Sequence, residues 1–446
     1  MGLFFYNLFL ILFNIGLRIA ALFNFKAKKW LLGRKGIWEK LEAEIRGQRS
    51  EKEDWKIIWV HCASLGEFEQ GRPVIEKLRL QYPNFKILLT FFSPSGYEIR
   101  KDYKGADMVF YLPMDGPQNA KRFLELVKPS LVIFVKYEFW FYYLNEVRQN
   151  NIPLLLISAL FRENSIFFKR YGGFNRKMLS FFDHMFVQNE TSEKLLAGIH
   201  LDNKTSVCGD TRFDRVIEIA EQFTTIPVVE KFIGSNRTIV AGSTWPGDEE
   251  ILQKSISTLN DPSLKLIIAP HEIGKEHLSQ IQKLFPGSIL FSELTIDNRQ
   301  LATDFQQPSL QAERSKTSNQ EPASGNTLII DNIGMLSRLY KYGYITYIGG
   351  GFGKGIHNTL EAAVYGKPVL FGPAYHKFQE AIDLVNVGGA ISITNSEECM
   401  SAIQKFLIKD SLYQESCAKA NDYVYANKGA TEKIMKYIQE KRLLTN

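Results

Sequence analysis

Short runs of hydrophobic residues alternate with longer amphipathic stretches from Trp55 onward. The short runs are rich in β-branched and aromatic residues, without a polar residue at every second position. This pattern is typical of strands buried on both faces of a parallel sheet, and the stretches between them have helical length and periodicity. In the first half, the predicted strands are 56–63, 85–92, 108–113, 131–138, 153–160 and 184–189.

The rhythm breaks at about 221–236 and then restarts. The second set of predicted strands is 237–244, 264–270, 327–332, 344–351, 367–373 and 389–394. Two similar α/β halves predict two doubly wound, Rossmann-like domains that face each other across a cleft. We expect these domains at 46–225 and 226–410, followed by a helical tail at 411–446.

Two segments depart from the alternating pattern. Residues 295–326 are polar and have no hydrophobic period, which predicts an excursion inside the second domain. Residues 3–25 are almost continuously apolar, and a membrane span needs about 20 such residues. We therefore expect a membrane anchor and an interfacial helix within residues 1–45.

The anchor prediction depends on what surrounds the apolar run. Asn7, Asn14 and Arg18 are costly at mid-membrane, so a helix that lies in the interface is an alternative to one that spans. The basic residues follow the run, which favours an uncleaved anchor over a signal peptide and predicts that the rest of the chain stays in the cytoplasm. A buried helix is the remaining alternative. A second interfacial candidate is 27–42, where Trp30, Leu31, Leu32, Ile37 and Trp38 mix with cations.

Charge and cysteine content narrow the function only a little. The formal charge of +6 over 446 residues is too weak to indicate nucleic acid, and no RNA-binding motif occurs. An anionic substrate or a membrane surface fits at least as well. The four cysteines are widely spaced and the histidines form no H-x-x-x-H pair, so the sequence predicts neither a disulfide framework nor a metal site.

The stretch 347–373 has the composition of a phosphate-binding turn. A predicted strand ends in three glycines, a Gly/Lys loop follows, and a helix is expected to open near Asn358. Backbone N–H groups of such a loop can approach a phosphate closely, and Glu361 in the first helical turn could bind ribose hydroxyls. The loop has no G-K-[ST] at Walker A spacing. A plain glycine turn with a helix-stabilising Glu361 is the alternative.

A second candidate is Glu67, which follows the first predicted strand in the segment "HCASLGE". Ligands of doubly wound proteins bind at the carboxyl ends of the strands, so this carboxylate is well placed for chemistry. The alternative is a helix N-terminal residue stabilised by the helix dipole.

Several motifs occur in the order of one known family. They are "HCASLGE", "KYEFW", "GDTRFD", an Ala-Pro pair before His271, "GGGFGKGIHNTLEAAVYGKPVLFGP" and the apolar N-terminus. Together they resemble the 3-deoxy-D-manno-octulosonic acid (Kdo) transferases of lipopolysaccharide synthesis, from the anchor to about residue 385. The resemblance implies a GT-B fold, CMP-Kdo as donor, a lipid A precursor as acceptor, inversion at the anomeric carbon and no catalytic metal or other cofactor.

The resemblance also implies roles for residues of the first domain, which would bind the acceptor. Glu67 matches the general base, and Glu138 matches a position that assists the transition state. Arg212 stands where the family commonly has Lys, and a cation there would suit the donor's carboxylate or the departing phosphate. The alternatives are a Glu138 paired with Lys136 and a solvated, structural Arg212.

In the second domain the resemblance implies a CMP-sugar site. Pro270 and His271 match a Pro-Arg pair, and Asn358, Thr359, Leu360 and Glu361 match Asn-Pro-Leu-Glu. The other expected donor-binding residues are Ser243, Thr244, Ile333, Gly334, Met335 and Gly353. For Ser243 and Thr244, capping of a helix that starts near Pro246 is the alternative.

These observations predict an enzyme of the inner (cytoplasmic) membrane with a single anchor and cytoplasmic catalytic domains. Its expected partners are CMP-Kdo, a lipid A precursor and membrane lipid, without nucleic acid. One rival is another membrane-associated GT-B transferase that uses a UDP-sugar. The other is a non-catalytic membrane scaffold, which would have no need of Glu67, Glu138 and Arg212 together.

Overall fold

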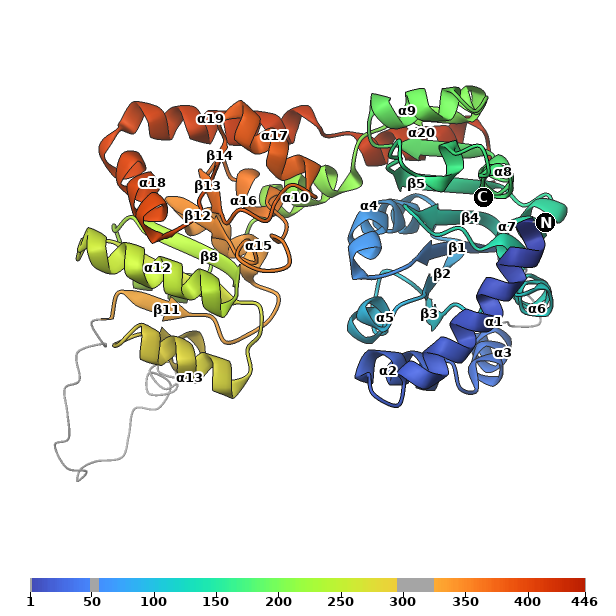
Figure 1. Ribbon diagram of the computed structural model, residues 1–446, viewed down its shortest axis with the longest axis horizontal. Helices are drawn as coiled ribbons and strands as arrows, with labels where there is room; N and C mark the ends of the chain where they lie inside the picture. Colours follow the sequence, from blue (N-terminus) through green and yellow to red (C-terminus); the bar gives the residue numbers. More distant parts are fainter. Residues whose placement is uncertain (1, 49–55, 295–324, 446) are drawn as a thin grey trace, which may run out of the picture. The chain divides into compact units, whose positions relative to one another are not determined.

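The computed structural model describes residues 2–48, 56–294 and 325–445 (Figure 1). The predicted excursion at 295–326 lies outside the described residues, except for its last two positions. The chain forms two compact units. Unit 1 consists of Met1–Arg215 and Asn427–Asn446, and unit 2 of Val216–Ala426.

Unit 1 is built on a seven-stranded parallel sheet of order β3-β2-β1-β4-β5-β6-β7. Its strands are β1 (Lys56–Cys62), β2 (Phe85–Phe91), β3 (Met108–Tyr111), β4 (Pro129–Val135), β5 (Leu154–Ala159), β6 (His184–Val187) and β7 (Thr205–Val207). All six predicted strands are present. The sequence missed β7, which is too short to show a hydrophobic run.

Helices cover both faces of this sheet. They are α3 (Ile37–Gln48), α4 (Leu65–Gln81), α5 (Pro94–Arg100), α6 (Pro117–Val127), α7 (Phe141–Gln149), α8 (Gly173–Ser180), α9 (Glu190–Ala197), α10 (Thr211–Glu221, which runs on into unit 2) and α20 (Ala430–Glu440), with short 3₁₀ turns at Ile166–Phe168 and Asp202–Lys204. The central strands are buried along their length, as the continuous apolar runs predicted.

Unit 2 repeats the design with a parallel sheet of order β10-β11-β9-β8-β12-β13-β14. Its strands are β8 (Thr238–Thr244), β9 (Lys265–Pro270), β10 (Ile289–Leu290), β11 (Thr327–Ile329), β12 (Ile345–Ile348), β13 (Val369–Phe371) and β14 (Ala390–Ser392). Its helices include α11 (Pro227–Ile233), α12 (Pro246–Leu259), α13 (Lys275–Leu284), α15 (Leu336–Leu339), α16 (Leu360–Ala363), α17 (Gln379–Val387), α18 (Ser396–Ile408) and α19 (Asp410–Ala426), with a 3₁₀ turn at Tyr340–Tyr342. The two-residue β10 was not predicted.

The strand orders locate a switch point in each sheet. In unit 1 the chain first adds β2 and β3 on one side of β1, and then adds β4 to β7 on the other side. The strand order therefore reverses between β1 and β4. In unit 2 the same reversal falls between β8 and β12. Ligands of doubly wound sheets bind outside the carboxyl ends of the strands at this reversal.

The N-terminal segment is part of unit 1 rather than a separate module. It forms α1 (Gly2–Ala20), α2 (Phe25–Gly33) and α3. The Tyr6 hydroxyl donates to Asp115 Oδ2 at 2.6 Å, and Tyr142 donates to Asn7 Oδ1 at 2.6 Å. One side of α1 therefore lies against the globular domain, and the polar Asn7 has a protein partner.

The prediction of an interfacial helix at 27–42 is wrong for two of its five hydrophobic residues. Trp30 and Ile37 are buried, because Trp30 packs on Phe92 and Ile37 belongs to the core of unit 1. Arg34 lies 3.6 Å from the Trp30 ring and donates to two backbone carbonyls of unit 1. These aromatic and basic residues therefore join the segment to the sheet.

The predicted domain boundaries differ from the compact units at both ends of unit 2. Unit 2 begins at Val216, inside α10, because that helix continues across the boundary without a break. The predicted tail at 411–446 divides: α19 belongs to unit 2 and α20 to unit 1. The Asp214 carboxylate accepts bonds from the backbone N–H groups of Gly429 and Thr431, both at 2.6 Å, which fixes the start of α20.

Candidate active site

Two predicted catalytic carboxylates lie at the switch point of unit 1. Glu67 is in the first turn of α4, directly after β1. Glu138 lies in the loop between β4 and α7, three residues beyond the strand that was expected to end with it. Burial raises the pKa of the Cys62 thiol, and the charges of both carboxylates add to that effect. Glu138 Oε2 lies 3.4 Å from Nε2 of His61, the next-to-last residue of β1.

Glu67 is half-buried and held by a neighbour. Ser64, which precedes α4, donates its hydroxyl to Glu67 Oε2 instead of capping the helix backbone. The Ser-Leu-Gly turn therefore orients the carboxylate, and the second oxygen can accept a proton from a substrate.

Glu138 takes its hydrogen bonds from two ring N–H groups. Trp140 Nε1 donates to Glu138 Oε2, and His61 Nε2 lies 3.4 Å from the same oxygen. Its side chain is 16% exposed, so it is mostly shielded yet reachable. Lys136 lies near the buried Asp210 and contributes to lowering the pKa of that carboxyl.

Arg212, the third predicted catalytic residue, is at the start of α10 and forms an ion pair with Asp210, two residues before it. Its Nε and Nη2 atoms lie 3.0 Å and 2.8 Å from Asp210 Oδ2. Gln70 of α4 donates to the same carboxylate at 2.9 Å, so Arg212 is connected to the helix that bears Glu67. Burial opposes ionisation of Asp210, but the charge and hydrogen bonds of Arg212 hold the pKa below its usual value.

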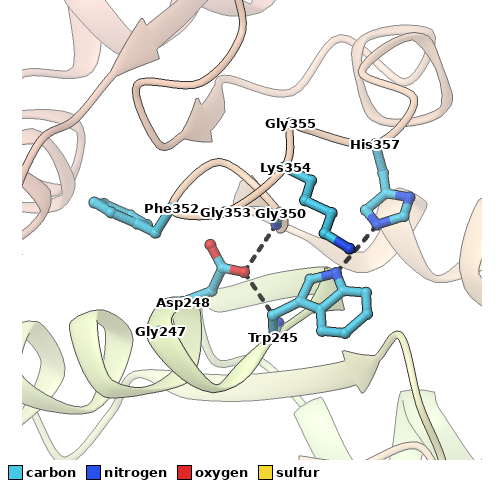
Figure 2. Close-up of a pocket in the computed structure, with 9 residues that line it drawn as sticks. All are labelled: Trp245, Gly247, Asp248, Gly350, Phe352, Gly353, Lys354, Gly355 and His357. Carbon is cyan, nitrogen blue, oxygen red and sulfur yellow. Dashed lines mark hydrogen bonds between the residues drawn. The ribbon is translucent and has the colours of Figure 1, made fainter.

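Unit 2 has a pocket of about 390 Å³ at its own switch point (Figure 2). It lies between the start of α12, which follows β8, and the glycine loop that follows β12. The lining residues are Trp245, Gly247, Asp248, Gly350, Phe352, Gly353, Lys354, Gly355 and His357. Of these, the sequence had singled out only Gly353 by position.

Asp248 fixes the two walls of this pocket to each other. Its Oδ2 accepts from the backbone N–H groups of Gly350 at 2.8 Å and Trp245 at 3.0 Å, and its Oδ1 accepts from Tyr347 at 2.8 Å. The carboxylate is buried, which raises its pKa. Asp248 thus binds the backbone at the start of α12 and also holds the glycine loop after β12 in place.

The loop itself needs glycine. Gly350 has φ 91°, and a Cβ there would lie 2.4 Å from the Gly355 carbonyl oxygen. Ser243, at a register shift near the end of β8, has φ 53°, and a Cβ on Gly349 would meet its carbonyl oxygen at 2.2 Å. The two strands of the switch point therefore approach each other at a distance that only glycine permits.

Two rings of the pocket lining, Trp245 and His357, both contact the ring of His271. The ring centroids of Trp245 and His271 are 4.7 Å apart, and those of His271 and His357 are 4.5 Å apart. Burial, and then the proximity of His271, lower the pKa of His357 to about 4, so this imidazole is neutral near pH 7. Lys354, on the exposed part of the loop, is the cation of the pocket lining.

The other predicted donor-binding residues differ in where their side chains point. Thr244 donates to Glu249 Oε1 at 2.9 Å and is buried. Thr359 and Leu360 are also buried, so these three side chains serve the core. Asn358 accepts from the Leu360 N–H at 3.2 Å, as a cap at the predicted helix start, and donates to Glu361 at 3.1 Å.

The remaining predictions fall at the same edge of unit 2. Pro270 ends β9, and Ile333, Gly334 and Met335 form the loop between β11 and α15, with Ile333 strongly exposed. Among the described ranges 2–48, 56–294 and 325–445, no group of three or more His, Cys, Asp or Glu residues could hold a metal ion.

Sequence reasoning missed Trp245, Asp248 and His357 in unit 2, and His61 in unit 1. Position gave a signal for two of them: His61 is next to the last residue of β1, and Trp245 directly follows β8. Asp248 lies in the first turn of α12, and His357 lies nine residues beyond the end of β12. Their hydrogen-bond partners, however, lie far away in the sequence, as with Asp248 and Gly350.

Two Rossmann-like units, each with polar residues at its switch point, define a GT-B-type glycosyltransferase fold. The structure resembles UDP-GlcNAc 2-epimerase from Neisseria meningitidis bound to UDP-GlcNAc, with TM-score 0.59, 19% identity, and coverage of 86% of this chain and 100% of that one. At this identity the likeness concerns the fold alone.

The sequence comparisons are more specific. A family model described as 3-Deoxy-D-manno-octulosonic-acid transferase (kdotransferase) matches residues 35–215. The 3-deoxy-D-manno-octulosonic acid transferase of Aquifex aeolicus is 30% identical over 356 residues, covering 78% of this chain and 86% of that protein. The enzyme of the same name from Haemophilus influenzae is 24% identical, with 85% of each chain covered. The chain belongs to the 3-deoxy-D-manno-octulosonic acid transferase family and is a glycosyltransferase.

Proposed function

We propose that this protein transfers Kdo from CMP-Kdo to a hydroxyl group of a lipid A precursor, with inversion at the anomeric carbon. Family membership supports Kdo transfer in lipopolysaccharide synthesis. The observation that supports the chemistry most directly is Glu67, a half-buried, oriented carboxylate at the switch point of unit 1.

In the proposed reaction, Glu67 takes the proton of the acceptor hydroxyl. The hydroxyl oxygen then forms a bond to the anomeric carbon of Kdo from the face opposite the phosphate. The bond between that carbon and the phosphate oxygen breaks, and CMP leaves with the electron pair. Glu138 is near the same edge, where its negative charge stabilises the positive charge that develops on the sugar ring.

We place the donor on unit 2. The pocket of about 390 Å³ is lined by the rings of Trp245, Phe352 and His357, which suit flat or apolar groups, and by Lys354, which suits a negative charge. Backbone N–H groups of the glycine loop can serve the phosphate. The neutral His357 adds no charge, so Lys354 is the residue of the lining that would recognise the donor's carboxylate or phosphate.

The same proposal includes the inner membrane, with both units on the cytoplasmic side. Within the described residues, α1 alone is long and apolar enough to cross a membrane, with mean hydropathy 1.8. Its outward side is apolar and exposed at Phe4, Phe9, Leu12 and Ile19. The basic residues of α2 follow it. We also propose that transfer needs no metal ion.

The test is transfer of Kdo from CMP-Kdo to a tetraacylated lipid A precursor, with products identified by mass spectrometry. Wild type is compared with Glu67→Gln and with Glu125→Gln, a matched change at an exposed site on α6. We expect Glu67→Gln to fold and bind CMP but to lose about 10³-fold in turnover, because general bases contribute roughly 10²–10⁴-fold. Glu125→Gln should equal wild type.

Near-wild-type turnover in Glu67→Gln would rule out its role as the base. The donor is tested separately by competition: CMP should displace labelled donor, and UDP should not. Displacement by UDP in place of CMP would favour the UDP-sugar alternative.

A further inference from the structure

Behind Glu138, three buried polar side chains form a chain of hydrogen bonds across two strands. Trp59 and His61 lie on β1 and Thr90 on β2, and all three side chains are fully buried. Trp59 Nε1 is 2.8 Å from Thr90 Oγ1, and Thr90 Oγ1 is 2.8 Å from His61 Nδ1. His61 Nε2 then faces Glu138 Oε2 at 3.4 Å.

The donors and acceptors of this chain fix the position of one proton. An indole N–H can only donate, so Trp59 gives its hydrogen to Thr90 Oγ1. The Thr90 hydroxyl could donate to His61 Nδ1 or accept from it, so the other ring nitrogen decides. His61 Nε2 faces the Glu138 carboxylate, which when ionised can only accept, so Nε2 carries the hydrogen. In a neutral imidazole, Nδ1 then accepts from the Thr90 hydroxyl.

That hydrogen points at Glu138. An ionised carboxylate can only accept, so the Nε2–H of His61 and the Nε1–H of Trp140 converge on Oε2. Within the described part of unit 1, Oε1 takes no hydrogen bond of its own, which leaves it for a substrate. The carboxylate is thus held on one oxygen and open on the other.

His61 itself cannot be the base. It has no exposed surface, one ring nitrogen accepts from Thr90, and the other nitrogen serves Glu138. Ring contacts with Trp59 and Phe134 hold the imidazole plane. A buried imidazole held in this way can orient the Glu138 carboxylate without touching the substrate.

We propose that His61 is a positioning residue for Kdo transfer, which holds the Glu138 carboxylate through an Nε2–H tautomer that the Thr90 hydroxyl stabilises at Nδ1. The inference rests on the proposed function, because it assumes that Glu138 acts on the reacting sugar. It adds a residue whose part in the reaction is indirect, and it predicts which of the two ring nitrogens matters.

The two nitrogens can be tested separately. A Gln side chain at position 61 places its amide nitrogen near the former Nε2, whereas Asn reaches only to the former Nδ1. We expect His61→Gln to keep kcat within about threefold of wild type. We expect His61→Asn to lose about 100-fold in kcat, the cost of a misplacement of about 1 Å at a reacting centre. The KM for CMP-Kdo should stay unchanged in both variants, because we place the donor on unit 2.

A second pair tests the tautomer without touching the histidine. Thr90→Ser keeps the hydroxyl group and should behave as wild type. Thr90→Val removes the hydroxyl that donates to His61 Nδ1 and should lose about tenfold in kcat. His61→Asn is the reference for complete loss of the contact between residue 61 and Glu138. Thermal melts of all four variants are measured beside the kinetics.

A double variant links the effect to Glu138. If His61 acts through Glu138, then Glu138→Gln should cost much less in the His61→Asn background than in wild type. Equal losses in His61→Asn and His61→Gln, or additive losses in the double variant, would overturn the inference. If wild type itself transfers no Kdo, the proposed function fails instead, and the two failures are distinguishable.

Discussion

The switch points of the two units use different chemical groups. In unit 1 the groups at the strand ends are carboxylate side chains, Glu67 and Glu138, each bonded on one oxygen and partly accessible. In unit 2 the carboxylate at the equivalent edge, Asp248, is buried and used on both oxygens. What unit 2 presents is a glycine backbone with aromatic rings.

Carboxylate side chains therefore serve different purposes in the two units. A carboxylate with a free oxygen can exchange a proton with a substrate, as catalysis needs. A carboxylate saturated by internal donors keeps a loop in one shape, as binding needs. We infer that unit 1 is built for reaction and unit 2 for recognition, and each prediction below tests one side of that contrast.

The largest expected effect is on recognition. Gly350→Val places a β-branched residue at φ 91°, with Cβ 2.4 Å from a backbone oxygen. We expect the affinity for CMP to fall by at least about 1,000-fold, which corresponds to about 4 kcal/mol. Isothermal titration with CMP measures this.

Gly274→Val is the matched control, because Gly274 has φ −65° and no atom within 4 Å of its Cβ position. It should bind CMP as wild type does. If Gly350→Val bound CMP normally and lost only turnover, unit 2 would not be a recognition unit in the sense proposed.

The second prediction concerns a buried carboxylate of unit 1 that resembles Asp248. Burial raises the pKa of Asp115 to about 6, against the hydrogen bonds from Tyr6 and from the start of α7. The unfolded chain loses this proton near pH 4, and the folded chain keeps it until about pH 6. Stability should therefore fall by roughly 3 kcal/mol as the pH rises through that window.

Urea unfolding of wild type and Asp115→Asn at pH 4.5 and pH 7 isolates the effect. The difference in unfolding free energy, wild type minus variant, should decrease between these pH values. A difference that is constant with pH would mean that Asp115 is ionised in the folded protein even at the lower pH.

The third prediction has the smallest expected effect on stability and compares carboxylate-to-amide changes in the two units. Asp248→Asn turns an acceptor into a donor opposite an N–H or O–H group and leaves buried groups unsatisfied. We expect a loss of about 2 kcal/mol in the stability of unit 2 and weaker CMP binding. Glu67→Gln should instead leave stability unchanged, while turnover falls by about 10³-fold. Thermal melts and kinetics on the two variants side by side decide whether this contrast holds.

Much of the fold could be predicted because burial along strands determines the hydrophobic pattern. All twelve predicted strands exist, and Glu67 was found because a strand end is visible in the sequence. The missed strands, β7 and β10, are three and two residues long and have no period to detect.

What could not be predicted depends on contacts between residues distant in the chain. Trp30 and Arg34 have the composition of a membrane-surface helix, yet they pack on Phe92 of unit 1. His61 was one histidine among seven, and its contacts with Thr90 and Glu138, both distant in the sequence, give it a defined role. The boundary at Val216 was invisible because α10 has no break there.

The return of the chain to unit 1 has a consequence for how the protein is made. The α20 residues Ile434, Met435 and Ile438 belong to the same core as Ile75 and Leu78 of α4, the helix that begins with Glu67. During synthesis, all of unit 2 leaves the ribosome before α20 does, because α20 follows unit 2 in the sequence. A nascent chain that has reached Ala426 therefore holds a complete unit 2, while α4 still exposes an apolar surface. The order of translation therefore leaves the core of unit 1 unfinished until unit 2 has been synthesised, and α20 then covers α4.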